Sequence, residues 1–313
     1  MPATVSVADP GRITILLCTW NGVPHLGAQL ESYLAQTGVA WDLWVSDDGS
    51  TDGTRAVLER FRDAHGTQRR IMLVDGPGQG GPANYLTLIG RQDLPPGPVA
   101  LSDQDDVWMP HKLARAQAGL ARAGAVAVYG AQSLHTDAAL AVIGRSRPPH
   151  GRPGFAHALV QNVVSGHSLA LSAGARALAA RAGVPAGVPY HDWWLYQLIA
   201  GAGGDVLIDA EAVLYYRQHH GNAMGAHQGR RATLARLRRI LRRDYGDWIA
   251  TNTTALAGIE RLLTPDNRRL LAAFGALPKA GPARAMGLAR LGIHRQGWAA
   301  TAGLWLAAGL GRV

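Results

Sequence analysis

Acidic side chains crowd into the segment LSDQDDVWMP, residues 101–110, where Asp103, Asp105 and Asp106 occupy three of four consecutive positions. Carboxylates this close repel one another unless solvent, a helix N-terminus or a bound cation offsets their charge. Mg²⁺ and Mn²⁺ prefer oxygen ligands and commonly bind one or two carboxylates together with substrate phosphates. The segment therefore indicates either a solvated turn that caps the next helix or a site for a divalent cation, and alone it leaves both open.

A second acidic cluster lies upstream in SDDGSTDGT, residues 46–54, where Asp47 and Asp48 precede a run of turn-forming residues. Such residues are typical of the turn between a strand and a helix, so one interpretation is purely structural. Ser50 or Thr51 would then cap the helix that follows. The other interpretation is a nucleoside site, because a carboxylate accepts hydrogen bonds from a base imide N–H or a ribose hydroxyl.

Apolar runs alternate with segments of helical periodicity through the first half of the chain. Continuous apolar runs predict strands buried on both faces, and apolar residues three and four apart predict amphipathic helices. We expect strands near 13–20, 41–46, 71–76, 99–106 and 125–132, and helices near 25–36, 52–66, 81–93 and 110–124. The alternation predicts an α/β fold with a Rossmann-like, mostly parallel sheet and helices on both faces.

The polar segments that follow these strands are expected to meet at one edge of the sheet. Thr19, Trp20 and Asn21 follow the first predicted strand, Asp47 and Asp48 follow the second, and residues 103–106 end the fourth. Ligands of open parallel sheets bind outside the carboxyl ends of the strands. The sequence therefore predicts one binding site to which all three segments contribute.

Two conspicuous features do not indicate chemistry of their own. The glycine-rich segment GPGQGGP, residues 76–82, lacks the Lys-Ser/Thr of a P-loop and the spacing of a dinucleotide fingerprint, so we expect a flexible loop. Cys18 lies inside a predicted buried strand and is interpreted as a small apolar residue. As the only cysteine in the sequence it excludes an intramolecular disulfide and fits a reducing compartment.

Five motifs, taken together, resemble one enzyme family. The segments TILLCTWNG, WVSDDGSTDGT, GGPANYLTLI, LSDQDDVWMPHKL and YHDWW occur in the order and at the spacing of the family 2 glycosyltransferases, and look most like the rhamnosyltransferase members. The resemblance covers roughly residues 12–225. It implies a GT-A-type fold, Mg²⁺ or Mn²⁺ as cofactor, and a dTDP- or UDP-sugar donor, with dTDP-rhamnose as the leading candidate.

The resemblance also implies roles for individual residues. Nucleotide binding would involve Thr19, Trp20, Asn21, Asp48 or its neighbour Asp47, Asn84 and Asp103. Asp105 matches the metal ligand, and Asp106 and Gly166 would lie near the donor sugar. The segment YYRQHHGN resembles the family's R-Q-H-x-x-N element, so Arg217, Gln218 and Asn222 would lie beside the diphosphate and His219 at the metal. The family often has Cys or Thr where His167 stands, which leaves that position without an assigned role.

Asp192, in YHDWW, matches the position of the catalytic base. A carboxylate there would take the proton of an acceptor hydroxyl during attack, and a single displacement would invert the anomeric centre. The diphosphate that leaves gains negative charge, which a metal and Arg217 would stabilise. Asp192 also begins a segment of helical character, so a role as N-cap is the structural alternative, and the two roles are compatible.

The character of the chain changes after residue 225, and we expect a catalytic domain over 1–225 and a basic helical region over 226–313. Lys and Arg number 31 against 22 Asp and Glu, a net charge of +9. A strongly basic helix is predicted over 229–248, with further helices near 249–275 and 283–310. The basic helix is interpreted as a solvated face, as a nucleic-acid contact or, our preference, as attachment to an anionic membrane; the apolar C-terminal segment WAATAGLWLAAGLG would add an interfacial face.

The N-terminal residues lack the apolar run of a signal peptide, and no segment reaches the roughly 20 apolar residues of a spanning helix. We therefore expect a cytoplasmic protein, peripheral on the inner face of the membrane. The function implied is an inverting, metal-dependent glycosyltransferase that acts on a glycan or lipid-linked acceptor in cell-surface polysaccharide synthesis.

Two other functions stay open. A sugar-phosphate nucleotidyltransferase shares the nucleotide-binding architecture, but would show a basic glycine-rich N-terminal loop, which CTWNGVPHLG does not supply. A non-catalytic protein that binds nucleic acid or membrane through its basic region is the second, although no nucleic-acid module is recognisable.

Overall fold

The structure, a computed structural model, describes residues 11–151, 153–218 and 243–313. These residues form two compact units. Unit 1 contains 11–148, 164–184 and 207–218, and unit 2 contains 149–163, 185–206 and 243–313. This division differs from the single boundary near residue 225 that we expected, because two earlier segments group with the C-terminal helices. The assignment of catalysis to residues 1–225 stays a prediction.

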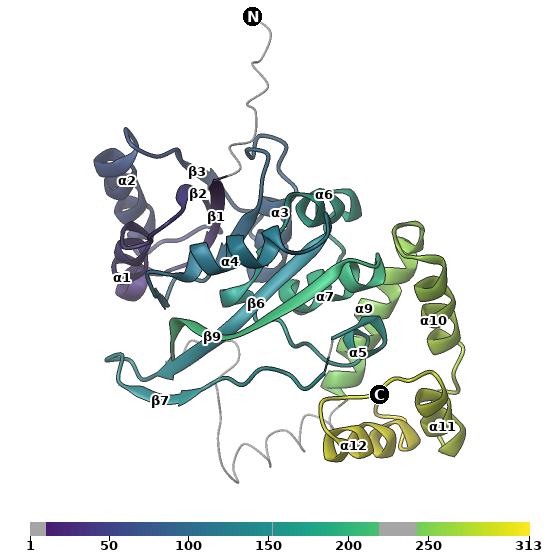
Figure 1. Cartoon of the computed structure of the whole chain (residues 1–313). Helices are drawn as coiled ribbons and strands as arrows, with labels where there is room; N and C mark the ends of the chain where they lie inside the picture. Colours follow the sequence, from purple (N-terminus) through teal and green to yellow (C-terminus); the bar gives the residue numbers. More distant parts are fainter. Residues whose placement is uncertain (1–10, 152, 219–242) are drawn as a thin grey trace, which may run out of the picture. The chain divides into compact units, whose positions relative to one another are not determined.

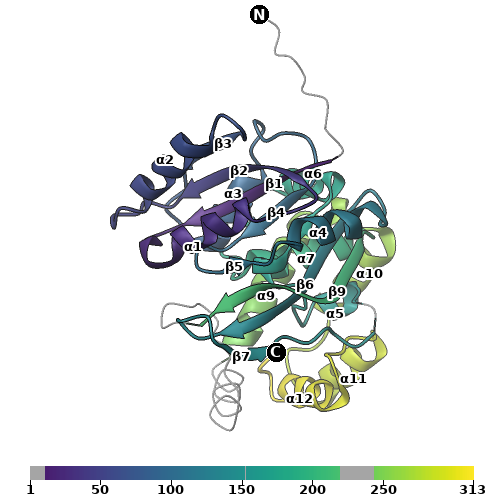
Figure 2. The same cartoon turned by 60° about the vertical axis from the view of Figure 1, so that its left-hand side comes forward.

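The described residues form a nine-stranded sheet in the order β3-β2-β1-β4-β8-β6-β9-β5, with β7 paired to β6 (Figures 1 and 2). The strands are β1 (Arg12–Thr19), β2 (Ala40–Asp47), β3 (Ile71–Asp75), β4 (Val99–Ser102), β5 (Val107–Trp108), β6 (Ala127–Thr136), β7 (Val142–Arg145), β8 (Ala170–Leu171) and β9 (Asp205–Arg217). The predicted α/β fold is confirmed, and its parallel part is the set β3-β2-β1-β4.

The parallel strands are those that continuous apolar runs predicted, with one difference that bears on the site. Every residue of β1 after Arg12 is buried, as expected for a strand covered on both faces. The predicted fourth strand extended to residue 106, but β4 ends at Ser102. The acidic cluster therefore lies in the loop beyond the strand, and the sheet continues through the antiparallel pairs β4–β8 and β8–β6.

In unit 1, the helices α1 (Val23–Leu34), α2 (Thr54–His65) and α3 (Gly81–Ile89) connect the parallel strands. Helix α4 (Lys112–Ala121) follows β5, and a short 3-10 helix (Gly166–Ser168) and α6 (Ala173–Ala182) stand before and after β8. The predicted cap of α2 is wrong. Its N-cap is Gly53, whose φ of 92° is favourable only for glycine, and Asp52 accepts the Thr54 N–H at 3.0 Å in place of a hydroxyl cap. Gly66 ends this helix, as expected.

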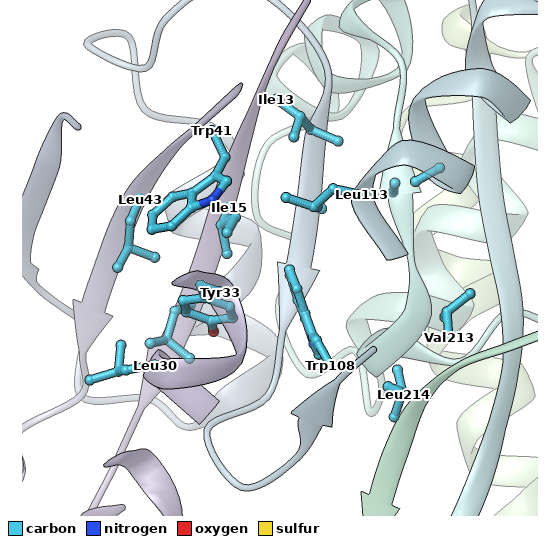
Figure 3. Packing of buried hydrophobic residues seen from close by; sticks show 14 of the residues in the cluster. Ile13, Ile15, Leu30, Tyr33, Trp41, Leu43, Trp108, Leu113, Val213 and Leu214 are labelled. Atoms are coloured by element: carbon cyan, nitrogen blue, oxygen red, sulfur yellow. The ribbon is translucent and has the colours of Figure 1, made fainter. Parts of the chain in front are cut away.

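Large side chains fill the space between the sheet and the helices of unit 1 (Figure 3). The ring of Tyr33, from α1, meets the rings of Trp41 and Trp108 edge to face, with centroids 6.1 and 4.8 Å away. Ile13 and Ile15 from β1 are fully buried in the same cluster. This packing fixes the strands whose carboxyl ends carry the polar segments.

Unit 2 is helical, with α5 (Phe155–Ala158), α7 (His191–Gly201), α9 (Asp244–Gly258), a 3-10 turn (Glu260–Leu262), α10 (Pro265–Gly275), α11 (Pro282–Arg290) and α12 (Trp298–Gly309). Residues 229–242 of the predicted basic helix lie outside the described residues. The predicted helix does not run unbroken to 248, because Arg243 has a φ of 69° and α9 starts after it. Within the described ranges, every helix is too short or too polar to cross a bilayer.

Candidate functional site

The carboxyl ends of three parallel strands lie side by side in unit 1, as the sequence predicted. Thr19 at the end of β1 pairs in register with Asp47 of β2, and Leu17 pairs with Ser102 of β4. The Thr19 hydroxyl donates to the Asp47 carboxylate at 2.8 Å. The polar segments that follow these strands therefore share one edge of the sheet.

The Asp47 carboxylate accepts hydrogen bonds from the turn that follows β2. Its carboxylate accepts from the Ser50 N–H at 3.1 Å and from the Ser50 hydroxyl at 2.5 Å, in addition to Thr19. The residue is 5% exposed. These contacts give Asp47 a structural role, which was one of the two interpretations of this segment. Asp48, the adjacent carboxylate, is partly exposed and is therefore better placed to contact a ligand.

Asp48 holds the glycine-rich loop that follows β3. Its two carboxylate oxygens accept the N–H groups of Gly78 and Gly80 at 2.7 and 2.8 Å. Both glycines have positive φ, 68° and 85°, a conformation that other residues adopt only with strain. A Cβ on Gly76 would lie 2.6 Å from the same carboxylate. The predicted flexible loop is thus attached to the acidic turn at two backbone amides.

Asn84, predicted to bind nucleoside, is 1% exposed near the start of α3. Its amide oxygen accepts from the Ser46 hydroxyl at 2.5 Å, and its amide nitrogen donates to the Ser46 carbonyl at 3.1 Å. Both ends of the amide therefore bind β2. In this structure Asn84 joins α3 to the strand that carries Asp47 and Asp48.

Trp20 and Asn21 form a backbone bridge between the end of β1 and two other loops. Gln104, inside the acidic segment, accepts the Trp20 N–H and donates to the Trp20 carbonyl, both at 2.9 Å. The Asn21 N–H donates to the Ser50 hydroxyl at 2.9 Å, and Asn21 has a φ of 48°. The Trp20 side chain is 62% exposed, so a large flat surface faces solvent at this edge.

The acidic segment brings together a possible ligand set for a metal. Ligand atoms of Asp103, Asp106 and His167 all lie within 4.8 Å of one another, the one such group of three among the described residues. The Tyr85 hydroxyl donates to Asp103 at 2.7 Å. Asp106 is fully buried, and one of its carboxylate oxygens has no hydrogen-bond partner within the described part of the chain.

Two carboxylate oxygens and one imidazole nitrogen suit Mn²⁺ better than Mg²⁺, which strongly prefers oxygen. An unsatisfied carboxylate oxygen in a buried position is also costly unless a cation or proton compensates it. The residues present therefore fit a divalent cation. Asp105, the ligand implied by family resemblance, is not part of this group, and its backbone carbonyl accepts from Arg217 Nε at 3.1 Å.

Burial and neighbouring charges shift the pKa values of both Asp106 and Lys112. Burial, and then the negative charges of Asp103 and Asp105, raise the pKa of Asp106 well above its usual value. Burial lowers the pKa of Lys112 to about 7, opposed by the charges of Asp106 and Asp103. Lys112 Nζ donates to the backbone carbonyl of His167 and lies 4.0 Å from the centre of the Trp108 ring. The Lys112 side chain therefore links the start of α4 to the segment that carries His167.

His167, which had no assigned role in the sequence, stacks on Tyr216 with ring centroids 4.6 Å apart. Burial, and then the positive charge of Lys112, lower the pKa of His167 to about 3. The neutral imidazole is the form that ligates metals. Gly166, the predicted donor-sugar residue, precedes it in the same 3-10 helix and is buried.

Arg217 ends β9 and donates hydrogen bonds to the acidic segment from both its backbone and its side chain. Its N–H donates to Asp106 at 3.4 Å, and its guanidinium donates to the carbonyls of Asp105 and Ala138. Gln218 follows, and its N–H donates to the Thr136 carbonyl at 2.8 Å. His219 and Asn222, the predicted metal and diphosphate residues, lie outside the described residues.

Asp192 belongs to unit 2 and lies in helix α7. It is not the N-cap of its helix, because Tyr190 holds that position and Asp192 lies in the first turn of α7. Its carboxylate accepts the Trp193 N–H at 2.7 Å, and a negative charge is favourable at a helix N-terminus. Trp193 and Trp194 are buried, as expected for core residues.

Sequence reasoning missed three residues that organise the site: Tyr85, Gln104 and Lys112. Each lies in one of the five motifs, so its position in the sequence indicated a place near the site although its residue type did not. Lys112 offered a further clue, since a lysine inside an apolar helix face next to an acidic segment is rarely buried without a partner.

The first 175 residues contain the family signal. The model of Glycosyl transferase family 2 matches residues 14–175. A glycosyltransferase of Nostoc sp., alr2836, is 33% identical over 104 residues, which are 33% of this chain and 31% of that protein. The chain thus spans about a third of this relative's length. The dTDP-rhamnosyl transferase RfbG of Shigella flexneri is 25% identical over 251 residues, 77% of this chain and 84% of RfbG.

Solved structures show the same fold. The mannosyltransferase PcManGT from Pyrobaculum calidifontis, in complex with GDP-Man and Mn²⁺, superposes with a TM-score of 0.53 at 19% identity, over 98% of this chain and 89% of that one. At this identity the likeness carries the GT-A-type fold alone. Together with the strand-end motifs, the family match means that the chain belongs to Glycosyl transferase family 2 and is a glycosyltransferase.

Proposed function

We propose that the protein is an inverting, metal-dependent glycosyltransferase that moves a sugar from a nucleoside-diphosphate sugar to a glycan or lipid-linked acceptor in cell-surface polysaccharide synthesis. The observation that carries the proposal is the group Asp103, Asp106 and His167, at the same sheet edge as Asp48. The similarity to RfbG supports dTDP-rhamnose as the leading donor.

The nucleotide would lie at this edge, with Trp20 as a surface for the base and Asp48 as an acceptor for its N–H groups. Asp103 would face the ribose, and Asp106, Gly166, Arg217 and Gln218 would surround the sugar and diphosphate. A divalent cation, Mg²⁺ or preferably Mn²⁺, would be held by Asp105, by resemblance, or by the group Asp103, Asp106 and His167, by geometry. When bound, it would neutralise the charge that develops on the leaving diphosphate.

Asp192 would act as general base. It would accept the proton of the acceptor hydroxyl as that oxygen bonds to the anomeric carbon, while the bond from this carbon to the diphosphate oxygen breaks. The products are the glycosylated acceptor with inverted configuration, the nucleoside diphosphate and one proton on the carboxylate. His219 and Asn222 keep their predicted roles at the metal and the diphosphate.

A thermal-shift panel of nucleotide sugars, with and without Mn²⁺, tests the donor. A cognate donor at about 100 times its Kd should stabilise the protein by about 2.7 kcal/mol, and only with metal. Asp105→Asn and His167→Gln, compared in the same assay, separate the two ligand sets. Full stabilisation by the donor in the presence of a chelator would contradict metal dependence.

The base is tested by Asp192→Asn, which keeps the size of the side chain. We expect the variant to bind nucleotide normally and to lose transfer by about 10²–10⁴-fold. Release of nucleoside diphosphate, and not of diphosphate, separates glycosyl transfer from the nucleotidyltransferase reaction. Normal transfer by Asp192→Asn would remove the residue from the mechanism.

We propose further that the protein is cytoplasmic and works at the inner face of the membrane, where a lipid-linked acceptor would be accessible. The sequence supports this with its basic region, 226–313, of which residues 226–242 lie outside the described part of the chain.

A further inference from the structure

The C-terminal helix α12 presents a face to solvent that contains no polar side chain. The residues of this face, called the α12 face below, are Trp298, Ala299, Ala302, Gly303, Trp305, Leu306 and Leu310. Trp298 is 85% exposed, Leu306 68% and Leu310 62%. Trp298, Ala302, Leu306 and Leu310 lie four residues apart and the other members lie beside them, so together they form one continuous stripe.

The opposite side of α12 is apolar as well. Leu304, Ala307 and Ala308 are buried within unit 2, and α12 packs against α11. A surface helix of a globular protein normally has a polar outer face, and a helix that is apolar all round is normally buried. Exposure of the α12 face to water is therefore unfavourable, and such an apolar surface marks a site that contacts a membrane or another protein.

The length of α12 restricts how it can contact a membrane. Twelve residues make a helix about 18 Å long, well below the roughly 30 Å of a hydrocarbon core, so α12 cannot cross a bilayer. A short helix that lies along the surface buries its apolar face at the boundary of head groups and acyl chains. Trp is enriched at this depth, and both Trp298 and Trp305 lie on the exposed side.

The sequence that contains α11 and α12 is strongly basic. Residues 267–313 contain seven Lys and Arg and no Asp or Glu, and over 226–313 the basic residues outnumber the acidic ones by 15 to 4. The whole chain has a net charge of +9, so this region supplies all of its excess positive charge. Arg290 at the end of α11 and Lys279 before it are exposed. Basic residues beside an apolar face favour an anionic lipid surface.

We propose that the α12 face inserts into the head-group region of an anionic bilayer and holds unit 2 at the membrane surface. This inference rests on the proposed function only for the lipid-linked nature of the acceptor. It assigns membrane contact to named side chains of the C-terminal apolar segment, which the sequence marked as interfacial only as a whole, and deepens the proposed work at the inner face of the membrane.

The test is flotation of the full chain with vesicles of phosphatidylglycerol and phosphatidylcholine in equal parts. The double variant Trp298→Ser/Leu306→Ser should bind these vesicles at least about tenfold more weakly, because two large apolar side chains are removed. The matched control is Val142→Ser/Ile143→Ser, whose residues on β7 in unit 1 are 56% and 57% exposed. The control should bind like the unaltered protein, and pure phosphatidylcholine vesicles should bind both weakly.

Two results would overturn the proposal. The first is unaltered vesicle binding by the double variant. The second is that light scattering without lipid finds the unaltered protein dimeric and the double variant monomeric, while both still bind vesicles. The α12 face would then be covered by a second copy of the chain. Release of nucleoside diphosphate with water or a soluble acceptor, measured on the same samples, shows separately whether the transfer reaction itself was assigned correctly.

Discussion

Tyr85 shows how one hydroxyl group supports the acidic segment. Its Oη donates to Asp103, and it also lies 2.5 Å from the Ser102 carbonyl, while its ring is buried in unit 1. Burial, and then the charge of Asp103, raise the pKa of this phenol well above its usual value. The hydroxyl therefore stays protonated and serves as a permanent donor to the carboxylate.

We expect Tyr85→Phe to raise the KM for the donor about tenfold, because Asp103 loses a hydrogen bond that holds it and such a bond is worth about 1–2 kcal/mol. The matched control is Tyr33→Phe, whose hydroxyl lies 2.6 Å from Ser102 Oγ and which is equally buried. Both variants should lose similar stability in urea, and only Tyr85→Phe should change the KM. An equal KM effect in both would mean that the hydroxyl acts only through the core.

Gly22 permits the bridge between Gln104 and Trp20. A Cβ at this position would lie 2.3 Å from Gln104 Oε1, so Gly22→Ala should displace the Gln104 side chain and break its two bonds to the Trp20 backbone. We expect weaker donor binding by about 1–2 kcal/mol, measured by titration calorimetry. Gly27→Ala in α1, where no atom lies within 4 Å, should leave binding unchanged and stabilise the helix by up to about 1 kcal/mol.

At this scale, the sequence located the site more reliably than it assigned the contacts. Asp47, Asp48 and Asp103 were predicted to share one edge, and they do, because parallel strands end together. The partners of Asn84 and Asp106 were not predictable. Asn84 binds Ser46, which depends on how α3 packs against β2, and Asp106 lies near His167, about 60 residues downstream.

Three elements of unit 1 meet at a single carboxylate. Asp209 in β9 accepts two bonds from Arg115 of α4, at 2.8 and 2.9 Å, and one from Tyr129 of β6 at 2.8 Å. Partial burial would raise its pKa, but these donors, with Arg115 as the largest contributor, lower the pKa of Asp209 to about 2. The charged form of Asp209 therefore ties the helix to two strands.

Because the folded pKa is below the usual value, this stabilisation is present above about pH 4 and is lost as the pH falls toward 2. Asp209→Asn should lower the free energy of unfolding by about 1–2 kcal/mol at pH 7. The difference from the unaltered protein should shrink between pH 4 and pH 2, as followed by urea midpoints. Glu59→Gln, on the exposed face of α2, is the matched control and should leave the free energy of unfolding at pH 7 unchanged. A difference that is independent of pH would assign the loss to packing.

Element prediction was most successful where burial dominates. The apolar runs of β1 to β4 predicted their strands, and the helices between them followed with ends shifted by a few residues. The two-residue strand β8 and the long strand β9 were not predicted. Strand β8 is too short to show a period, and β9 carries three acidic residues within its first seven. Tertiary pairing, and not local pattern, makes these segments strands.

The motifs predicted to bind nucleotide and the helical C-terminal region lie in different units of the molecule. The strand-end motifs lie in unit 1, and α9 to α12 lie in unit 2. Hydrogen exchange with saturating dTDP and Mn²⁺ should therefore show protection at residues 19–22, 47–52 and 102–106, and little change over 282–310. Protection concentrated in α11 and α12 would contradict the placement of the nucleotide. Adenosine diphosphate with Mn²⁺ serves as the control for unspecific binding.

The fold class followed from the sequence, because strand and helix alternate in the first half of the chain and five motifs occur in family order. The arrangement of units did not follow. Residues 149–163 and 185–206 belong to unit 2 although they lie between segments of unit 1, and nothing in their local composition marks the change. Chain crossings of this kind are decided by long-range packing, which a single sequence does not display.

The burial of Cys18 has a practical consequence. It is the only thiol in the sequence, and burial together with the nearby charges of Asp103 and Asp48 raises its pKa well above the usual value. An alkylating reagent should reach the thiol only when β1 opens locally. The rate of Cys18 modification therefore measures how often this central strand opens. A cysteine introduced at Trp298 would accept a fluorescent or spin label alone, and the protein is ready for such labelling without prior removal of its own cysteine.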